Sequence, residues 1–431
     1  MNKKILRLAI PNILSNLTVP LLSSVDTAIM GHLPAPAYIG GIAVGSMIFN
    51  FLYWGVGFLR MGTTGLTAQA YGQKSNSEVI MTFSRALIVA VGTAAVFLLT
   101  KDLIEYISFA LVNGSAEVEK YARIYFRIRI YAAPATLSLY ALHGWFLGMQ
   151  NAKFPLYLSV LVNVLNIILN FVFVYRLNLN VDGIAWATVI SQYTGLLFGL
   201  FLMGKYYSDV FRYFDKNKLL QVEKIKKFFN VNFDLFIRTL FLIFVFSFFT
   251  AKSAEFGDTV LSANSILLQL WLILSYGVDG FAFAAESLVG KYMGRRDEPM
   301  LKKTVKYVLA WGLAQGFVLS IIFFIWIKEI IILYTNQTIV IETAMQYAMW
   351  TIFAPLINAV CFIWDGVFIG ATAARPMRNS MVFSTLVVFL PVFFLLNPQI
   401  GNHALWLAMI LFMLARGVSL SIYLPRLIKQ W

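Results

Sequence analysis

The chain has 431 residues, of which 60% are hydrophobic and 13% are charged, and its mean hydropathy is +0.76. This composition excludes an ordinary soluble protein, because apolar stretches of about 20 residues, each long enough to span a bilayer, recur along the whole chain. The formal net charge of +14 does not indicate nucleic-acid binding, since most basic residues lie in short loops between the apolar stretches and report membrane topology.

The first segment resembles a signal peptide only in its basic start. Pro11, Asn12 and Asn16 interrupt the apolar run and no small-residue cleavage site follows, so the segment is predicted to be a retained first span. The single cysteine, Cys361, lies in an apolar run, so an intramolecular disulfide is not possible.

Hydropathy predicts an all-α integral membrane protein with twelve transmembrane helices. Twelve spans place both termini on one side of the membrane. The predicted spans are approximately 6–31, 38–66, 84–104, 121–148, 154–175, 183–206, 229–253, 259–290, 303–327, 343–372, 378–398 and 402–425.

The distribution of Lys and Arg predicts which side holds the termini. Loops on the terminus side carry 23 of these residues and the opposite loops carry 6. Because basic residues collect on the cytoplasmic side, both termini are predicted to lie in the cytoplasm, and the protein is expected in the inner (cytoplasmic) membrane of the cell.

The longest polar connection falls at the middle of the chain, with YFDKNKLLQVEKIKK at its centre. This connection predicts an N-terminal lobe of six helices over residues 1–206, a cytoplasmic linker over 207–228 and a C-terminal lobe of six helices over 229–431. The linker itself is expected to be solvated and to touch anionic lipid.

An internal repeat supports this division. A shift of 222 residues lays HGWFLGMQNAK (143–153) over DGVFIGATAAR (365–375), and GVGFLRMGTTGLTAQAYG (55–72) over GVDGFAFAAESLVGKYMG (277–294). Because six spans separate the copies, both halves enter the membrane from the same side, which predicts a parallel repeat about an axis along the membrane normal.

One acid lies inside the first span, in the stretch SSVDTAIMGHL. An ionised carboxylate in the membrane is costly and usually functional, and burial raises its pKa, so Asp26 is predicted to bind and release a proton. A structural acid bonded to a neighbouring helix is the alternative. Pro11 and Pro20 in the same span each remove a backbone hydrogen bond and are predicted to let the helix bend, although a static kink would explain them too.

The fifth span carries a polar stripe. Asn163, Asn166 and Asn170 are spaced by three and four residues, so they share one helix face, which should meet the bundle interior. Thr188 on the sixth span is the expected neighbour. Interhelical hydrogen bonding alone would also account for these side chains.

The second half carries charges that the first half lacks. At the 222-residue shift, Asp279, Glu286 and Asp365 lie over neutral or weakly basic residues, and Arg238 is expected to pair with an acid of this half. These four residues, together with Asn163, are the candidates to line a substrate cavity. The sequence shows no ATP-binding, metalloprotease or serine-nucleophile motif, so no enzyme activity, cofactor or metal site is expected.

The residues resemble the DinF-like branch of the multidrug and toxic compound extrusion (MATE) family along nearly the whole chain. The resemblance rests on five stretches, namely PNILSNLTVPLLSSVDTAIMGHL, GIAWATVISQY, FIRTLFL, GVDGFAFAAESLVGKYMGRRD and WDGVFIGATAARPMRNS. It implies a protein with two six-helix lobes that exports organic cations or other amphiphiles by alternating access, driven by inward H+ or Na+ movement.

The resemblance also assigns site residues. Asp26 looks like the coupling aspartate of the family's first helix, Pro11 resembles the proline at which that helix bends, and Asn166 and Thr188 match two further members of the polar cluster. Asn170 departs from the pattern, which has a second aspartate there. An amide cannot take up a proton, so H+ is favoured over Na+ as the coupling ion.

The resulting prediction is a proton-coupled exporter of small amphiphilic or cationic molecules that works as a monomer in the lipid bilayer. The alternative with the same fold is a flippase for a lipid-linked precursor, for which intramembrane arginines leave room. A passive channel or an assembly scaffold is the alternative of another class, and neither needs a titratable switch.

Overall fold

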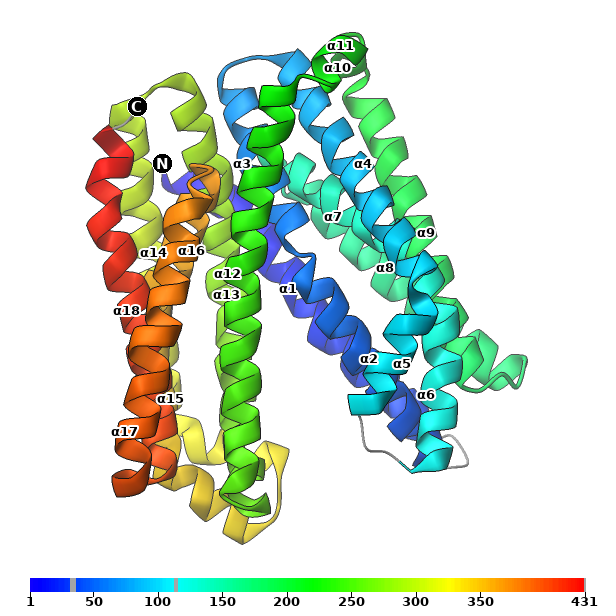
Figure 1. Ribbon diagram of the computed structural model, residues 1–431, viewed down its shortest axis with the longest axis vertical. Coiled ribbons are helices and arrows are strands. Elements are labelled where there is room, and N and C mark those ends of the chain that lie inside the picture. The colour runs from blue at the N-terminus through cyan, green and yellow to red at the C-terminus, as the bar shows by residue number, and fades with distance from the viewer. Residues whose placement is uncertain (32–35, 112–114, 430–431) are drawn as a thin grey trace. The chain divides into compact units, whose positions relative to one another are not determined.

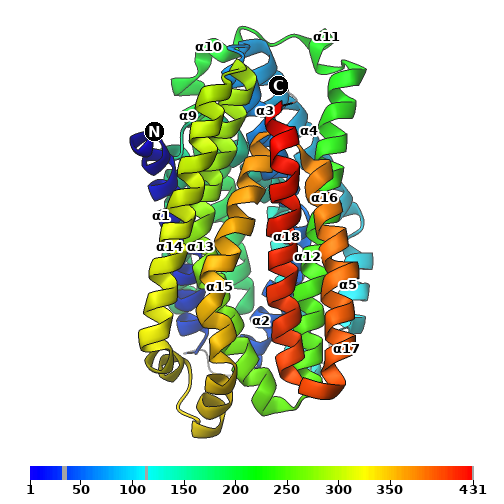
Figure 2. The same ribbon diagram turned by 90° about the vertical axis from the view of Figure 1, so that its left-hand side faces the viewer.

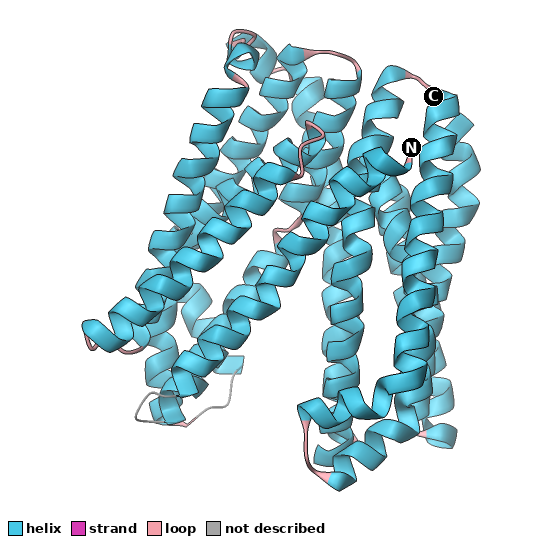
Figure 3. Cartoon of the chain, turned by 180° about the vertical axis from the view of Figure 1, so that it is seen from behind, coloured by secondary structure: helices cyan, strands magenta, loops and turns pink. Residues whose placement is uncertain are grey.

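The structure is a computed structural model that describes residues 1–31, 36–111 and 115–429, with the side chains of 19–31, 36 and 274 outside this description. Within these ranges every regular element is a helix, and short loops join the helices (Figure 3). Two compact units result. One is Leu14–Phe228, and the other combines Met1–Ile13 with Phe229–Trp431.

The first half of the chain forms the helices that are coloured blue to green in Figure 1. They are α1 (Asn2–Gly31), α2 (Pro36–Gly55), α3 (Phe58–Gly72), α4 (Asn76–Leu99), α5 (Lys101–Leu111), α6 (Ala116–Arg129), the 3-10 helix η1 (Ile130–Ala132), α7 (Ala133–Gly148), α8 (Lys153–Phe171), the π-helix η2 (Val172–Arg176), α9 (Val181–Tyr206), α10 (Ser208–Phe211) and α11 (Lys216–Leu219).

The second half forms longer helices, and Figure 2 shows α18 between α15 and the α16–α17 segment. They are α12 (Val222–Glu255), α13 (Asp258–Arg295), α14 (Glu298–Tyr334), α15 (Thr338–Gly370), α16 (Ala374–Phe383), the π-helix η3 (Ser384–Phe389), α17 (Leu390–Ile400) and α18 (Asn402–Lys429).

All twelve predicted spans fall on helices. Ten helices of the described part are long and apolar enough to cross a membrane, one of them formed by α2 and α3 together. The other two predicted spans correspond to α1 and to the segment from α6 through η1 to α7. At 1.5 Å per residue, each of these two is also long enough for a hydrocarbon core of about 30 Å.

The unit boundaries differ in part from the predicted lobes. One boundary lies between Phe228 and Phe229, but the first 13 residues group with the second half of the chain. Part of the predicted linker is helical, since it contains α10 and α11 and α12 already begins at Val222. The charged start of α12 therefore continues directly into a membrane helix.

Matching glycines give the repeat its physical basis. A Cβ added at Gly144 of α7 would lie less than 3.0 Å from the carbonyl oxygen of Arg60 in α3. At the corresponding position of the second half, a Cβ at Gly366 of α15 would come equally close to the carbonyl oxygen of Ala282 in α13. Only glycine lets these helix backbones touch, which is how membrane helices pack closely.

The turns repeat as well. Lys74 and Gln150 have φ values of 57° and 64°, and the residues 222 positions later, Arg296 and Thr372, have 56° and 54°. A left-handed conformation is unusual for residues other than glycine and ends a helix sharply. The two halves therefore share their helix ends in addition to their packing.

Each unit has its own apolar core and an apolar outer surface. Trp145 and Phe126 are fully buried in the first unit, and Trp271 and Trp406 in the second. Large apolar side chains such as Leu197 also lie on the surface of the helices. Because lipid tails solvate such side chains, this surface fits a bilayer.

Candidate functional site

The three asparagines of α8 lie on one face, as their spacing requires. Asn166 and Asn170 are buried, with 3% and 0% of their surface exposed, and Asn163 is half-buried. Buried amides need hydrogen-bond partners, so this face must meet other polar groups inside the unit.

Two of these amides form a directed chain of hydrogen bonds, here called the donor chain. Asn170 Nδ2 donates to Asn166 Oδ1 (3.1 Å), and Asn166 Nδ2 donates to Thr188 Oγ1 of α9 (3.2 Å). The Thr188 hydroxyl in turn donates to the carbonyl oxygen of Ile184 (3.2 Å). The three hydrogen bonds all run in the same direction. Asn170 is the first donor and is called the head of the donor chain, and the carbonyl oxygen of Ile184 is the last acceptor.

Helix α1 lies along the same face of α8. Asn163 Nδ2 donates to Thr18 Oγ1 (2.7 Å), and Ser15 Oγ donates to Ser159 Oγ (2.7 Å). These two contacts fix the register of α1 against α8. The side chains of Asp26 and Pro20 lie outside the described residues.

Pro11 is half-buried in α1 and lies two residues before the point where the chain passes from one compact unit to the other. It cannot donate a backbone hydrogen bond to the preceding turn. The next residue, Asn12, donates from Nδ2 to the carbonyl oxygen of Leu8 (2.8 Å).

The second half contains a buried charged group, here called the Asp365 cluster. Asp365 of α15 accepts a hydrogen bond at Oδ2 from Arg238 Nη2 of α12 and another from Arg416 Nη2 of α18 (2.7 Å). The two arginine side chains are 7% and 1% exposed, and the carboxylate is 11% exposed. Sequence reasoning gave Arg416 no site role, although its signal was present as an arginine inside an apolar span.

The other two predicted acids of this half lie on α13. Glu286 is buried where α13 meets α15, since its backbone is what Gly370 packs against. Asp279 is half-buried, at the repeat position of Gly57 near the break between α2 and α3. Among the described residues, no group of three or more His, Cys, Asp or Glu side chains could hold a metal ion.

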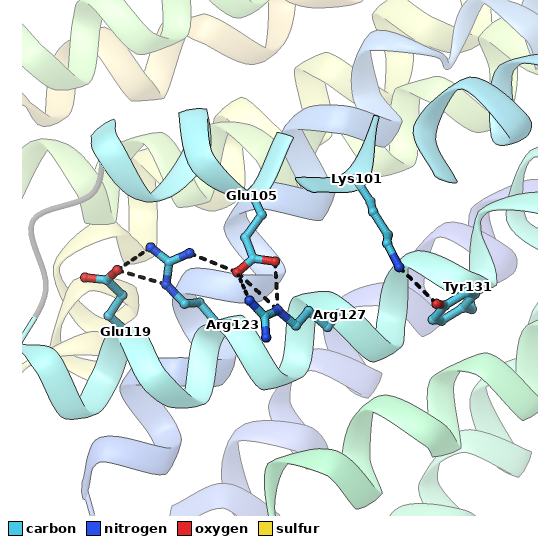
Figure 4. Close-up of polar contacts among 6 residues, drawn as sticks. All are labelled: Lys101, Glu105, Glu119, Arg123, Arg127 and Tyr131. Carbon is cyan, nitrogen blue, oxygen red and sulfur yellow. Dashed lines mark hydrogen bonds and ion pairs between the residues drawn. The ribbon is translucent and has the colours of Figure 1, made fainter. Parts of the chain in front are cut away.

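A second charged group, here called the α5–α6 clasp, joins two short helices of the first half (Figure 4). Glu105 of α5 accepts from Arg127 Nε (2.9 Å) and Arg123 Nη1 (2.9 Å) of α6, and Arg123 also pairs with Glu119. Burial alone would raise the pKa of the Glu105 carboxyl, but the hydrogen bonds and charges of both arginines lower it below its ordinary value.

Comparison of the sequence with known proteins finds relatives over its whole length. The MatE family model matches residues 11–172 and 235–395. DNA damage-inducible protein F of Escherichia coli (strain K12) is 38% identical over 420 residues, which cover 97% of this chain and 91% of that protein. Multidrug resistance protein NorM of Vibrio cholerae is 24% identical and covers 99% and 95% of the two chains.

Solved structures share the fold. A MATE structure in the bent conformation has a TM-score of 0.88 at 17% identity and covers 100% of this chain and 96% of that one. A MATE structure in the straight conformation has a TM-score of 0.87 at 18% identity and covers 100% and 97%. The predicted all-α fold of two six-helix lobes is thereby confirmed.

Proposed function

Because the chain belongs to the MatE family, we propose that it exports small amphiphilic or cationic molecules in exchange for an inward-moving cation, with H+ favoured over Na+. The relative NorM is named for multidrug resistance, which supports a broad choice of small substrates. Both termini would lie in the cytoplasm, and a single chain of two lobes would suffice for alternating access.

The observation that carries the proposal is the donor chain together with the register of α1. The contact Ser15–Ser159 joins positions 144 residues apart, and Thr18–Asn163 joins positions 145 apart. Asp26 and Asn170 are also 144 positions apart. Since parallel α-helices rise equally per residue, the backbone of Asp26 comes level with the head of the donor chain.

An acid at this level would act as the switch. When ionised, the Asp26 carboxylate only accepts hydrogen bonds, and when protonated it can also donate one. Proton binding would therefore change its bonding to the amides beside it and favour a different shape of α1. Pro11 and Pro20, which weaken the backbone ladder of that helix, would let it bend, and the bent and straight structures of this fold are consistent with such a change.

The choice of H+ rests on Asn170. Sodium prefers several oxygen ligands with negative charge nearby, whereas a proton needs one titratable group. The amide at Asn170 leaves a single acid expected in this cluster. The buried amides around it would supply hydrogen bonds to either protonation state.

The test is dye transport into proteoliposomes under an imposed pH gradient. Asp26→Asn should abolish pH-driven transport of ethidium, because the amide is isosteric but cannot release a proton. Asp209→Asn is the matched control, since the side chain of Asp209 is 81% exposed in α10 and should not affect transport. Wild-type transport rates in Asp26→Asn would refute the assigned role.

A second variant separates the two ions. Asn170→Asp would place a second acid at the head of the donor chain, so a sodium gradient should then drive ethidium transport that it does not drive in the wild type. The measurement is transport under separate H+ and Na+ gradients. Sodium-driven transport by the wild type would contradict the preference for H+, and its absence in Asn170→Asp would contradict the role given to Asn170.

A further inference from the structure

We infer that the Asp365 cluster is an oxyanion site that takes the carboxylate of an amphiphilic substrate. This inference rests on the proposed export function and adds that preferred substrates carry a negative group beside their apolar or cationic part. Carboxylates are suitable ligands because a guanidinium presents its N–H donors in a planar fork that matches two carboxylate oxygens.

The Asp365 cluster carries a net positive charge. The cluster contains two guanidinium groups and one carboxylate, so its three side chains sum to one positive charge. All three are nearly buried, and Arg238 lies nine positions into its predicted span, or about 14 Å along the helix. A net charge at such depth is costly unless a counter-charge reaches it.

The arginines of the cluster do not use all of their donors on strong acceptors. Among the described residues, Arg238 Nε is buried and has no hydrogen-bond partner. Arg416 directs its Nη1 to the sulfur of Met413 (3.2 Å), which is a weak acceptor. A buried guanidinium normally satisfies its donors with strong acceptors, so both arginines retain capacity for a second anion.

Asp365 holds both arginines at a single oxygen atom. Both arginines donate to the same oxygen of Asp365, and this carboxylate is the most exposed member of the cluster. An incoming carboxylate would therefore meet the arginines from the side of Asp365 and compete with it for their N–H groups. While no substrate is bound, Asp365 would bind the N–H groups of the arginines and hold their side chains in place. It would then act as a resident competitor of the substrate carboxylate.

The first half of the chain has no counterpart of the cluster. The positions of Arg238, Asp365 and Arg416 correspond to Asn16, His143 and Thr194 in the first half. The shift holds locally, because a Cβ at Gly195 would meet Leu139 and a Cβ at Gly417 would meet Cys361, again 222 positions apart. The first half builds the same helix contacts without these charges. These helix contacts can therefore form without the charges, which supports a role for the cluster beyond packing.

The test compares two probes that share one dye and differ in whether its carboxyl group is free or esterified. Rhodamine B has a free carboxylate, and rhodamine B ethyl ester has the same dye with that group masked. Binding to the purified full-length protein in detergent is measured by fluorescence polarisation. The wild type should bind the acid more tightly than the ester.

Two substitutions should change this preference in opposite directions. Arg238→Gln should weaken binding of the acid about tenfold and leave the ester unchanged, because one charge-assisted hydrogen bond is lost. Asp365→Asn should strengthen binding of the acid by a similar factor, because the resident competitor is neutralised. Arg238→Lys keeps the charge and should retain the preference in part.

The control is Arg378→Gln, which breaks a comparable ion pair with Asp234 (2.6 Å) in the same unit but outside the cluster, and should change neither affinity. Equal affinity of the wild type for both dyes, parallel changes for both dyes in Arg238→Gln, or weaker acid binding in Asp365→Asn would each overturn the inference. Asp26→Asn should keep the preference for the acid in this equilibrium assay, so failure of the proton-coupling role leaves this result unaffected.

Discussion

Each half of the chain contains one carboxylate that accepts hydrogen bonds from two arginines, but the two carboxylates occupy non-equivalent places. Glu105 lies in the short helix α5, and its partner side chains Arg123 and Arg127 are 34% and 67% exposed. Asp365 lies inside α15, and its two partners are almost fully buried. Both carboxylates are therefore buried, with the side chains of Glu105 and Asp365 5% and 11% exposed, but the arginines of Glu105 reach the surface and those of Asp365 do not.

Neither group is inherited through the repeat. The clasp residues Glu105, Arg123 and Arg127 correspond to Ile327, Met345 and Met349 in the second half. The shared features are instead the glycine contacts and the left-handed helix ends. The two halves therefore share the positions at which helix backbones touch, whereas each half has its own charged groups.

The largest expected effect distinguishes the two carboxylates. Asp365→Asn leaves two buried guanidinium groups without a counter-ion and should lower the free energy of unfolding by about 3–5 kcal/mol. Glu105→Gln should cost about 1 kcal/mol or less, because its arginines can turn to water. Unfolding midpoints of the purified variants in detergent check this difference. Similar losses of unfolding free energy in both variants would show that burial of the arginine partners does not distinguish the two groups.

Stabilisation by a bound carboxylate should also distinguish Asp365 from Glu105. If the Asp365 cluster binds carboxylates, rhodamine B should raise the unfolding midpoint of Asp365→Asn more than that of the wild type, since a ligand stabilises the folded state that binds it. The ester should raise neither midpoint selectively. Glu105→Gln should show no such rescue.

The next effect tests what the halves share. Gly144→Ala and Gly366→Ala should each destabilise the protein by about 1–3 kcal/mol, because each adds a methyl group where two backbones already touch. Gly92→Ala in α4 is the matched control, since nothing lies near its added Cβ, and it should be neutral or slightly stabilising. Unequal losses at the two equivalent glycines would break the structural equivalence of the halves.

The smallest expected effect is the change in stability at low pH. The pKa of Glu105 is lowered in the folded protein, so the stabilisation from the clasp is present above the ordinary value of 4.5 and is lost as pH falls through the lower folded pKa. The unfolding midpoint of the wild type should thus fall more steeply than that of Glu105→Gln below about pH 4.5. Parallel curves for the two proteins would contradict the assigned pKa shift.

The sequence predicts the helices and the repeat well because both depend on patterns within short stretches of residues. Apolar stretches mark the spans, and the spacing of Asn163, Asn166 and Asn170 places them on one face, as observed. The 222-residue shift found at the level of residue identities reappears as matched glycine contacts.

The charged groups are harder to predict because they depend on which helices are neighbours. Arg238 and Arg416 are 127 and 51 positions from Asp365, and no local pattern brings α12, α15 and α18 together. Glu105 lies just after the predicted end of a span. Its burial depends on contacts with two arginines of another helix, α6, and no periodic pattern in the sequence indicates such contacts. The side-chain environment of Asp26 remains a prediction.

The glycine contacts also restrict how this transporter can move. At Gly144 and Gly366 the neighbouring helix contributes backbone atoms of Arg60 and Ala282, so each pair of helices is in direct backbone contact. We expect the pairs α3–α7 and α13–α15 each to move as one rigid body, because close backbone contact resists sliding. Conformational change should then occur in segments without such contacts, and the distance between two probes, one on each helix of a pair, should stay constant during turnover.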